Sequence, residues 1–581
     1  MLQNTLTRKE LPPPDPTSEI EVTQPRFGSA GAPDGWLELG SWLPLARRAN
    51  LVTSLGTLIP RLQAHRRAHQ QSLHSQRRLV SAPANPSLPA WTRVSATASE
   101  VGSRLIVGFR NHTCRYRQDD PLQLGCFNCG FYAGVRTVAG VTPEELQDQL
   151  RESLHAGFRS GRPFDVLEFL SDGSFLNDAE FDTRSRAAVL ECVPRLPYVR
   201  RLLIESVPAH VSAGPNVLTT ILRTLRPDQD LEIGIGLETA DDFIRKACIN
   251  KGFLWDEFEG AVATIAGLPD RDRRRCAIVA YLLVKPALLS SAEAVDDVVA
   301  TLERLEQIAR AYRVKIVPKL EPAAISDGTM LSLLYAGGPT APHYYAPVNY
   351  WAVLEILART ARRRPRALRW LRIGAREDMD DVLKMPAVYT ADGRYDRDDF
   401  VLYYALQQFN RTHDLDRVLS TMVGTRPDGR DGLLGNGSSL LRWVDDELGQ
   451  PSDAAELLAR RPRTARLARD LGREAEALRR VYPVLDAVEL LPGVEWGPVA
   501  GVGPFLLQPS SPPADGTVRT RASVAISAIL RRLNLRLHEA EVFEIRQEPD
   551  GHVRLFFDLL DFILCDRIPV WAHLSTKERN C

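Results

Sequence analysis

Three cysteines lie close together in TCRYRQDDPLQLGCFNCGFY, residues 113–132 of a chain of 581 residues that has eight cysteines in all. Cys114, Cys126 and Cys129 follow the pattern C-x11-C-x2-C. The short CFNC turn can place two sulfurs on one metal centre, and the longer arc brings the third sulfur around to it. A closed structural zinc site takes four protein ligands, whereas a four-iron cluster held by three thiolates leaves one iron open. The spacing therefore indicates an iron–sulfur cluster with a reactive iron.

A second interpretation of the same cysteines is a zinc site in a structural or scaffold protein, with His112 as the fourth ligand. His112 and Cys114 are two residues apart at the end of an expected strand, where their side chains converge poorly. Phe127 beside the sulfurs limits solvent, and Gly125 and Gly130 let backbone N–H groups approach sulfur. These surroundings favour a cluster that exchanges electrons, and a metal analysis separates the two interpretations.

The elements that must position these cysteines are short apolar runs that alternate with longer amphipathic stretches. Such runs are typical of strands in a parallel sheet that is covered on both faces. Right-handed crossovers join such strands, and functional side chains gather on the loops at their carboxyl ends. The cysteine loop directly follows the first run. The expected strands are 105–109, 165–170, 200–206, 231–238, 277–284 and 314–319, and the expected helices are 143–156, 180–193, 215–225, 241–266 and 292–312.

Composition bounds the classes of protein to which the chain can belong. Apolar residues make up 44% and charged residues 25%, and Lys plus Arg equals Asp plus Glu at 73 each. No apolar run approaches the roughly 20 residues that a membrane-spanning helix needs. A neutral chain has no global field that attracts nucleic acid, although a local basic patch is compatible with it. We therefore expect a cytoplasmic protein without a membrane segment, in which clustered cysteines bind metal more often than they form disulfides.

The ends of the chain differ from its middle. The first 35 residues are rich in Pro, Gly and Ser and predict a mobile arm, and residues 36–79 predict helical segments broken at Pro44 and Pro60. The arginines of that region predict a solvated helix face, with a phosphate-contacting helix as the alternative; they are Arg66, Arg67, Arg77 and Arg78.

After the RRRPR run at 362–366, the pattern becomes largely helical, and 454–485 is its clearest amphipathic segment. A helix at 521–534 and a hairpin of EVFEIRQ and HVRLFFDLL follow. We expect three domains: a mobile arm and helical N-terminal extension at 1–90, a partial barrel at 91–365, and a mostly helical α+β accessory or substrate domain at 366–581.

Five sequence blocks together resemble one enzyme family. FRNHTCRYRQDDPLQLGCFNCGFY, FLSDGSFLNDAEF, LLIESVPAHV, LEIGIGLETADDFIRKACINKGF and AYLLVKPALLSSAEAVDD occur in the order seen in radical S-adenosylmethionine (SAM) enzymes of the Elongator-catalytic-subunit type. They are most similar to the archaeosine-biosynthesis radical SAM enzymes, from about Trp91 to Leu357. The first cysteine gap is wider than is usual in that family. Asp172 and Asn177 stand where the tRNA-modifying relatives carry a serine and an aspartate, so the substrate class stays open.

The resemblance implies an α/β fold, a partial (β/α)6 barrel that binds a [4Fe-4S] cluster through Cys114, Cys126 and Cys129. In this family, one electron from the cluster cleaves SAM to methionine and a 5′-deoxyadenosyl radical, which abstracts hydrogen from the substrate. The implied electron donor is a flavodoxin or ferredoxin. The substrate is either a modified nucleoside in tRNA or a small biosynthetic metabolite.

The resemblance also implies residues that bind SAM at the ends of the strands. The turn SDGS corresponds to the amino-group-binding turn of the family, and its glycine permits close approach of the backbone. Glu238 can accept hydrogen bonds from ribose hydroxyls, or be an acid beside the N-terminus of the next helix. Lys285 can neutralise the SAM carboxylate or an acidic substrate, or be an ordinary strand-end lysine. The expected cofactor-binding residues are Ser171, Asp172, Gly173, Ser174, Glu205, Ser206, Glu238 and Lys285.

Other candidate residues have simpler interpretations. Cys192, Cys248 and Cys276 lie in helix or strand patterns and are expected to be small buried side chains. Asn250 to Gly252 follow a helix, where we expect helix termination more than substrate contact.

Overall fold

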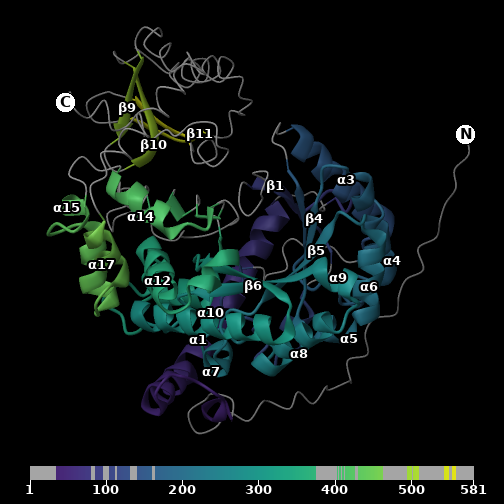
Figure 1. Cartoon of the computed structure of the whole chain (residues 1–581), viewed down its shortest axis with the longest axis horizontal. Coiled ribbons are helices and arrows are strands. Elements are labelled where there is room, and N and C mark those ends of the chain that lie inside the picture. The colour runs from purple at the N-terminus through teal and green to yellow at the C-terminus, as the bar shows by residue number, and fades with distance from the viewer. Residues whose placement is uncertain are drawn as a thin grey trace, which may run out of the picture.

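The computed structural model describes residues 35–79, 85–95, 104–111, 114–130, 140–159 and 164–374, parts of 402–461, and four strands between 494 and 557. Its central feature is a sheet of eight strands that lie side by side in sequence order (Figure 1). They are β1 (Trp91–Ser95), β2 (Arg104–Gly108), β3 (Val166–Leu170), β4 (Arg201–Glu205), β5 (Asp230–Gly236), β6 (Cys276–Val284), β7 (Lys315–Pro322) and β8 (Arg372–Ile373).

The direction of the strands confirms the expected fold. Strands β2 to β8 are parallel, and β1 pairs with β2 in the antiparallel direction. Because β2 to β7 coincide with the six expected strands, the chain has the α/β partial barrel. Strand β8 joins the same sheet beyond residue 365, and the division into three domains stays a prediction.

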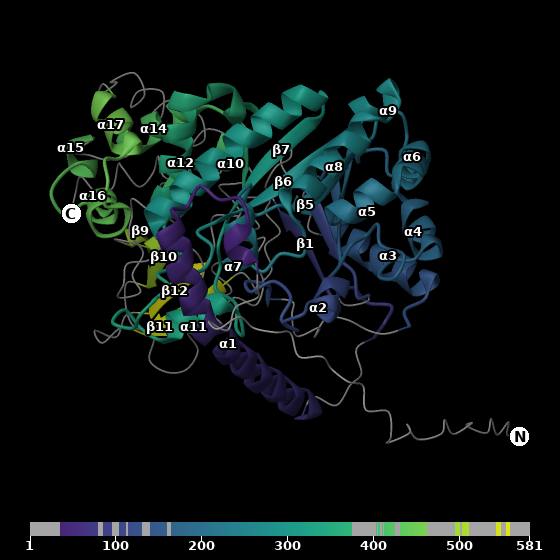
Figure 2. The same ribbon diagram turned by 90° about the horizontal axis from the view of Figure 1, so that it is seen from below.

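Helices connect the successive strands and lie along the outer side of the sheet (Figure 2). The N-terminal half contains η1 (Trp36–Glu38), α1 (Leu45–Leu79), α2 (Arg115–Asp119), α3 (Pro143–Arg159), α4 (Thr183–Leu190), η3 (Val193–Arg195), α5 (Pro208–Ala213), α6 (Pro215–Thr224), α7 (Asp242–Ala247), α8 (Trp255–Ala266) and α9 (Asp270–Arg274). The remainder are α10 (Ser291–Tyr312), α11 (Met330–Ala336), α12 (Tyr350–Arg363), η4 (Pro365–Trp370), α14 (Leu415–Gly424), α15 (Arg430–Leu433), α16 (Ser439–Trp443), the π-helix η6 (Val444–Leu448) and α17 (Asp453–Arg460).

The two faces of the sheet differ in polarity. Alternate strand residues such as Leu167, Ile233 and Ile278 belong to the main hydrophobic core. The strand residues between them point to the opposite face of the sheet, and many of these are polar. The expectation that apolar residues cover both faces is therefore wrong for this second face. Successive side chains of a strand point to opposite faces, so a run that is mostly apolar can still place its few polar side chains on one face. The polar set includes Glu168, Glu205, Glu232, Tyr281 and Lys319.

Ion pairs neutralise the buried charges of this polar face near the amino ends of the strands. Arg372 donates two hydrogen bonds of 2.8 Å to the carboxylate of Glu232, and Arg104 pairs with Glu168 at 2.5 Å. Burial raises the pKa of Glu232, but Arg372 and the nearby Arg201 outweigh it and lower that pKa to about 2. A buried charge is tolerated when it is paired in this way.

The N-terminal helix departs from its expected form. Helix α1 begins after Pro44 as expected, but it runs through Pro60 to Leu79 without a break. A proline inside a helix costs about 3 kcal/mol. Leu55, Ile59 and Leu62 are at most 1% exposed and pack into the main core. Burial of such side chains contributes about 1.5–3 kcal/mol each, which is enough to keep the helix intact.

The arginines of α1 are not one solvated face. Arg67 is exposed, as expected, but Arg66 is only 4% exposed and contacts the cysteine loop. The prediction of a solvated face is therefore wrong for Arg66, because its side chain lies on the buried side of the helix. The side chains of Arg77 and Arg78 lie outside the described set.

The expected helix at 241–266 is two helices, α7 and α8, separated by residues 248–254. Asn250 in that connection has a φ of +56°, in the left-handed region that ends a helix. The break is therefore the helix termination that the CINKGF segment predicts, placed inside the expected helix.

The described C-terminal elements include helices and a second sheet. Glu355 of α12 is fully buried and accepts hydrogen bonds from the backbone N–H groups of Asp453 and Ala454 at the start of α17. The expected hairpin is confirmed as the antiparallel pair β11 (Val542–Gln547) and β12 (Val553–Phe557). In that sheet, β12 is followed by β10 (Val502–Pro509) and β9 (Val494–Val499). The expected helix at 521–534, and 454–485 beyond α17, lie outside the described residues.

No helix among the described residues has the length and apolar character that crossing a bilayer requires.

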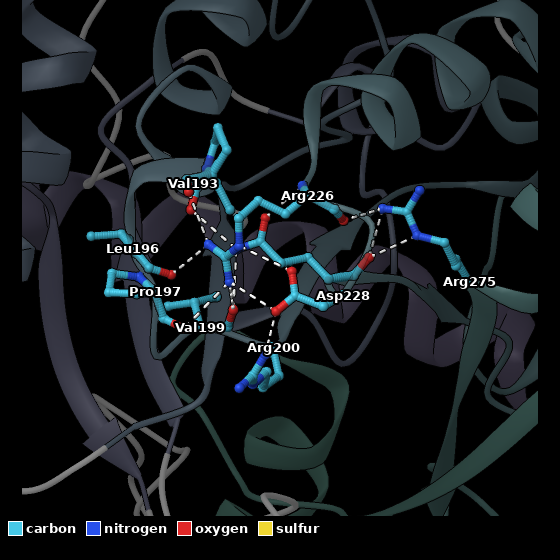
Figure 3. Close-up of polar contacts among 10 residues, drawn as sticks. Val193, Leu196, Pro197, Val199, Arg200, Arg226, Asp228 and Arg275 are labelled. Carbon is cyan, nitrogen blue, oxygen red and sulfur yellow. Dashed lines mark hydrogen bonds and ion pairs between the residues drawn. The ribbon is translucent and has the colours of Figure 1, made fainter.

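An arginine ties together the loops at the amino ends of β4 and β5, as Figure 3 shows. The guanidinium of Arg226 donates hydrogen bonds of 2.9–3.3 Å to four backbone carbonyls, and it also pairs with Asp228 at 3.0 Å. Arg275 in turn donates to the carbonyl of Arg226 at 2.6 Å. The four accepting carbonyls belong to Pro194, Leu196, Pro197 and Val199.

We predict that Arg226→Ala destabilises the fold. Four carbonyls would lose a charged donor, at a cost of about 2–4 kcal/mol in the free energy of unfolding. Thermal melting should show a lower midpoint than for the wild type. Arg200→Ala is the control, since Arg200 forms only an exposed pair with Asp228, which contributes little. Equal midpoints for the two variants would contradict the role of Arg226.

Candidate functional site

The three cysteines lie on the loop that leaves the carboxyl end of β2. Cys114 directly precedes α2. Cys126 and Cys129 close a tight turn in which the N–H of Cys129 donates to the carbonyl of Cys126 at 3.2 Å. None of the three forms a disulfide, and all three are half-buried. The structure thus places them at the edge of the sheet where the parallel strands direct functional side chains.

The thiols influence one another electrostatically. Burial raises the pKa of Cys126 to about 12, the ammonium of Lys251 lowers it, and the nearby Cys129 and Cys114 raise it further. Burial also raises the pKa of Cys114. The three sulfurs therefore share one low-dielectric environment, in which a bound cationic group would favour their thiolate forms.

Two buried polar side chains hold the shape of the cysteine loop. The carboxylate of Asp120 accepts hydrogen bonds from the N–H groups of Leu124 (2.9 Å) and Gly125 (2.8 Å). The amide of Asn250 donates to that carboxylate and to the carbonyl of Gly125, both at 2.9 Å. The hydroxyl of Tyr116 donates to the carbonyl of Asn250 at 2.9 Å. Asn250 thus ends a helix, as expected, and also fixes the loop.

The backbone of Phe127 joins the loop to two other segments. Its N–H donates to the carbonyl of Ile249 at 2.7 Å, and its carbonyl accepts from the N–H of Met330 at 2.9 Å. The Phe127 ring is fully buried, so the expected apolar cover of the sulfurs is present on this side. Phe131, Tyr132 and His112 lie outside the described residues.

The turn at 171–174 lies against the cysteine loop. Glu180 accepts hydrogen bonds from the N–H of Arg115, at 2.7 Å, and from the N–H of Ser174. A Cβ atom at Gly173 would lie 2.0 Å from the Glu180 carboxylate and 3.4 Å from the Cα atom of Cys114. Only glycine fits there. Ser171 donates to the carbonyl of Gly173 at 3.1 Å, and Asp172 is half-buried in the same turn.

Two of the expected cofactor-binding residues, Ser174 and Ser206, form a hydrogen bond between the segments that follow β3 and β4. The hydroxyls of Ser174 and Ser206 are 2.7 Å apart. Next to Ser206, burial and the carboxylate of Glu168 raise the pKa of Glu205 to about 7, although Lys319 acts in the opposite direction. The structure therefore brings Ser174, Glu205 and Ser206 together near the turn at 171–174.

Glu238, at the end of β5, forms a 2.7 Å ion pair with Lys251 and has a φ of +67°. Asp241 caps α7 by accepting from the N–H of Ile244 at 2.8 Å, so Glu238 is not needed as a cap. A Cβ atom at Gly236 would lie 2.5 Å from the Lys251 ammonium, so a larger residue there would displace that side chain. Since Lys251 also acts on Cys126 and Cys129, Glu238 belongs to the same site.

Lys285 lies elsewhere. Its ammonium donates to the carbonyl of Ala346 at 3.1 Å and to the carboxylate of Glu447 at 3.3 Å, and it is 7% exposed. The backbone of Lys285 has a φ of +63°. The structure therefore directs this side chain to η6, not to the cysteines.

The remaining candidate residues have mostly structural roles. Cys248 and Cys276 are buried as expected, and Cys192 is half-buried. Among the described residues, which include Cys114, Cys126 and Cys129, no three His, Cys, Asp or Glu side chains are grouped in this arrangement so as to hold one metal ion.

Comparison with known proteins finds archaeal relatives that match much of the barrel. The archaeosine synthase subunit beta of Methanosarcina acetivorans is 25% identical over 277 residues, 47% of this chain and 72% of the relative. The protein of the same name from Thermococcus kodakarensis is 26% identical over 357 residues, 61% of this chain and 98% of the relative. These are proteins of the group that the five sequence blocks resemble. The chain is thus similar to archaeosine synthase beta subunits.

Two solved structures are similar to part of the chain. The queuine lyase from Clostridium spiroforme bound to SAM and queuine is 17% identical, with a TM-score of 0.27, over 39% of this chain and 79% of that chain. The radical SAM methyltransferase TsrM from Kitasatospora setae is 11% identical, with a TM-score of 0.28, over 42% of this chain and 41% of that chain. No protein-family model matches the chain.

Four residues that shape the site around the cysteine loop were not predicted to belong to it. The sequence predicts Asn250 and Lys251 to end a helix, and it gives no role to Asp120 or Glu180. Their signal in the sequence is weak: Asp120 is one of two successive aspartates beside a proline, and Glu180 lies at the start of an expected helix. Each acts through partners that are not local in sequence.

We predict that Asn250→Gly and Asn250→Ala both loosen the cysteine loop, because both remove the amide that bonds Asp120 and Gly125. Amide hydrogen exchange of residues 120–130 should be faster in both variants. Asn250→Ala should also lower the free energy of unfolding by about 1 kcal/mol relative to Asn250→Gly, since alanine resists the left-handed region. Unchanged exchange in both variants would contradict the role of Asn250.

We also predict that Glu205 makes stability depend on pH. The folded chain keeps the Glu205 proton up to about pH 7, whereas the unfolded chain loses it near the ordinary pKa of 4.5. As pH rises between these values, only the unfolded state gains from ionisation, so the fold loses stability. Glu205→Gln removes this loss and should gain more over the wild type at pH 8 than at pH 5 in thermal melts. The same gain at both values would contradict the prediction.

Proposed function

We propose that the chain binds a [4Fe-4S] cluster through Cys114, Cys126 and Cys129 and uses it with SAM as a radical SAM enzyme. The observation that supports this proposal most strongly is that the carboxylate of Glu180 holds two segments of the chain together. One is the loop with three thiols, and the other is the turn at 171–174 that the family uses for the SAM amino group. Glu180 accepts from the backbone of both elements.

The donor set suits such a cluster. Three half-buried thiols that form no disulfide lie on one loop, and the Lys251 ammonium beside two of them favours the thiolate that an iron ligand must be. The amide of Asn128, between Cys126 and Cys129, has both of its polar atoms buried without a hydrogen-bond partner in the described part of the chain. An amide N–H in that position can donate to a cluster sulfur.

The remaining residues are assigned from their places around the loop. The turn at 171–174 offers close backbone approach to the SAM amino group, and Glu238 offers a carboxylate to ribose hydroxyls. Glu205 and Ser206 complete the wall between β3 and β5. Lys285 remains proposed as a partner for the SAM carboxylate or an acidic substrate, which requires it to exchange its bond with Glu447.

The chemistry that the cluster supplies when bound is the one-electron cleavage of SAM. The chain itself contributes orientation and the exclusion of water. Phe127 and the packed loop shield one side of the thiols, and the polar side chains around β3, β4 and β5 fix the orientation of the bound cofactor.

The substrate that we propose is a modified nucleoside in tRNA or a small biosynthetic metabolite, and the electron donor a flavodoxin or ferredoxin. The names of the sequence relatives support the nucleoside, and the neutral net charge of the chain supports the metabolite. Titration of tRNA at several salt concentrations separates them, because contacts with phosphates give an affinity that falls steeply with salt.

We predict that the chain, reconstituted anaerobically, holds about four irons and releases 5′-deoxyadenosine when dithionite and SAM are added. Cys126→Ala should lose most of the iron and all of this product. Cys192→Ala is the matched control, because Cys192 is also a half-buried free thiol but lies away from the loop.

The outcome that contradicts the proposal is a colourless protein with stoichiometric zinc that Cys126→Ala abolishes. That result would favour the zinc-binding structural protein that uses the same cysteines. A brown protein that forms no 5′-deoxyadenosine would retain the cluster but overturn the radical chemistry.

A further inference from the structure

Arg66 connects the N-terminal helix α1 to the cysteine loop. Its guanidinium Nη2 atom donates to the carbonyls of Cys126 at 2.9 Å and Phe127 at 3.1 Å, and its Nη1 atom donates to the carbonyl of Leu124. Its Nε atom donates to the carbonyl of Gly328 at 2.8 Å. One side chain thus binds the backbone on both sides of a predicted cluster ligand.

Neighbouring side chains of α1 contact the same two segments. Gln63 donates to the carbonyl of Leu122 at 3.1 Å, and a ring nitrogen of His65 lies 3.1 Å from the hydroxyl of Ser332. Leu62 on the same turn of the helix is fully buried. The face of α1 at residues 62–66 is therefore a docked surface, with Arg66 at its centre.

The position of Arg66 has two physical effects on the loop. Its planar fork fixes the directions of three carbonyls around Cys126, those of Leu124, Cys126 and Phe127, which a flexible ammonium cannot do. Its charge is only 4% exposed, so water screens it weakly, and it favours added negative charge at the turn between Cys126 and Cys129. Thiolates and a reduced cluster are such negative charges.

We propose that Arg66 is a positioning residue that couples the N-terminal helix to the metal site. It seats the turn of Cys126 for ligation, and its charge raises the reduction potential of the bound cluster. This inference rests on the proposed function, and it extends the radical SAM site to a segment outside the barrel. Helix α1 then acts as a part of the redox centre.

The chain offers a matched control for a general loss of stability. Arg226 also donates to four backbone carbonyls (Figure 3), but these lie at the amino ends of β4 and β5. The cysteines follow the carboxyl end of β2, at the other edge of the sheet. Arg226→Ala therefore removes a similar set of hydrogen bonds without touching the metal site.

The test compares the full-length wild type with Arg66→Ala, Arg66→Lys and Arg226→Ala after anaerobic iron and sulfide reconstitution. Two quantities are measured: the rate of iron loss to a chelator, and the midpoint potential by redox titration. Arg66→Ala should lose iron several-fold faster and have a lower potential. Arg66→Lys should lose iron faster while its potential stays near that of the wild type. Arg226→Ala should match the wild type in both.

The inference is overturned if Arg66→Ala and Arg226→Ala have the same potential and the same rate of iron loss. A second measurement does not need the metal, and it decides the matter if a variant folds poorly or takes up little iron. Amide exchange of residues 122–128 in the iron-free chains should be faster in Arg66→Lys than in the wild type, and unchanged in Arg226→Ala. Equal exchange would also overturn it. If the wild type binds no iron, the proposed function fails, whereas the exchange result still decides whether Arg66 seats the loop.

Discussion

The loop that carries the three thiols depends on buried polar side chains that reach it from other parts of the chain. Between β2 and the Cys126–Cys129 turn, its regular structure is the short helix α2. Asn250 and Arg66 donate hydrogen bonds to its buried backbone carbonyls, and Asp120 accepts from its N–H groups. An unpaired buried backbone group costs about 1–3 kcal/mol, so these partners decide which shape the loop takes.

The same principle organises the face of the sheet on which the polar side chains lie. Near the amino ends of the strands, Arg372 and Arg104 neutralise Glu232 and Glu168 in close pairs. Toward the carboxyl ends, the positive charge of Lys319 does not outweigh the effects of burial and of Glu168 on Glu205, so the pKa of Glu205 is raised. Close ion pairs thus lie at one end of the strands, and a carboxyl with a raised pKa lies at the other, where perturbed pKa values are typical of functional sites.

What the sequence predicted well was local. The strands β2 to β7 follow from short apolar runs, and the place of the cysteines follows from the rule that parallel strands present their loops at one edge. What it could not predict depends on contacts between distant residues. Arg66 and Gly328 are 262 positions apart, and Asn250 and Asp120 are 130 apart. A lone arginine on a helix is typical of a solvated face, and only the packed structure shows that this one is buried. The same holds for Lys285, whose partner Glu447 is 162 positions away.

The contact between Arg66 and Gly328 also sets an order of events during synthesis. Helix α1 leaves the ribosome before any strand of the sheet, but one of the carbonyls that Arg66 binds belongs to a segment after β7. The cysteine loop acquires its final shape only when nearly the whole barrel has been translated. Iron delivered to a nascent chain would therefore meet thiols that are not yet arranged, and assembly of the proposed metal centre would follow completion of the barrel.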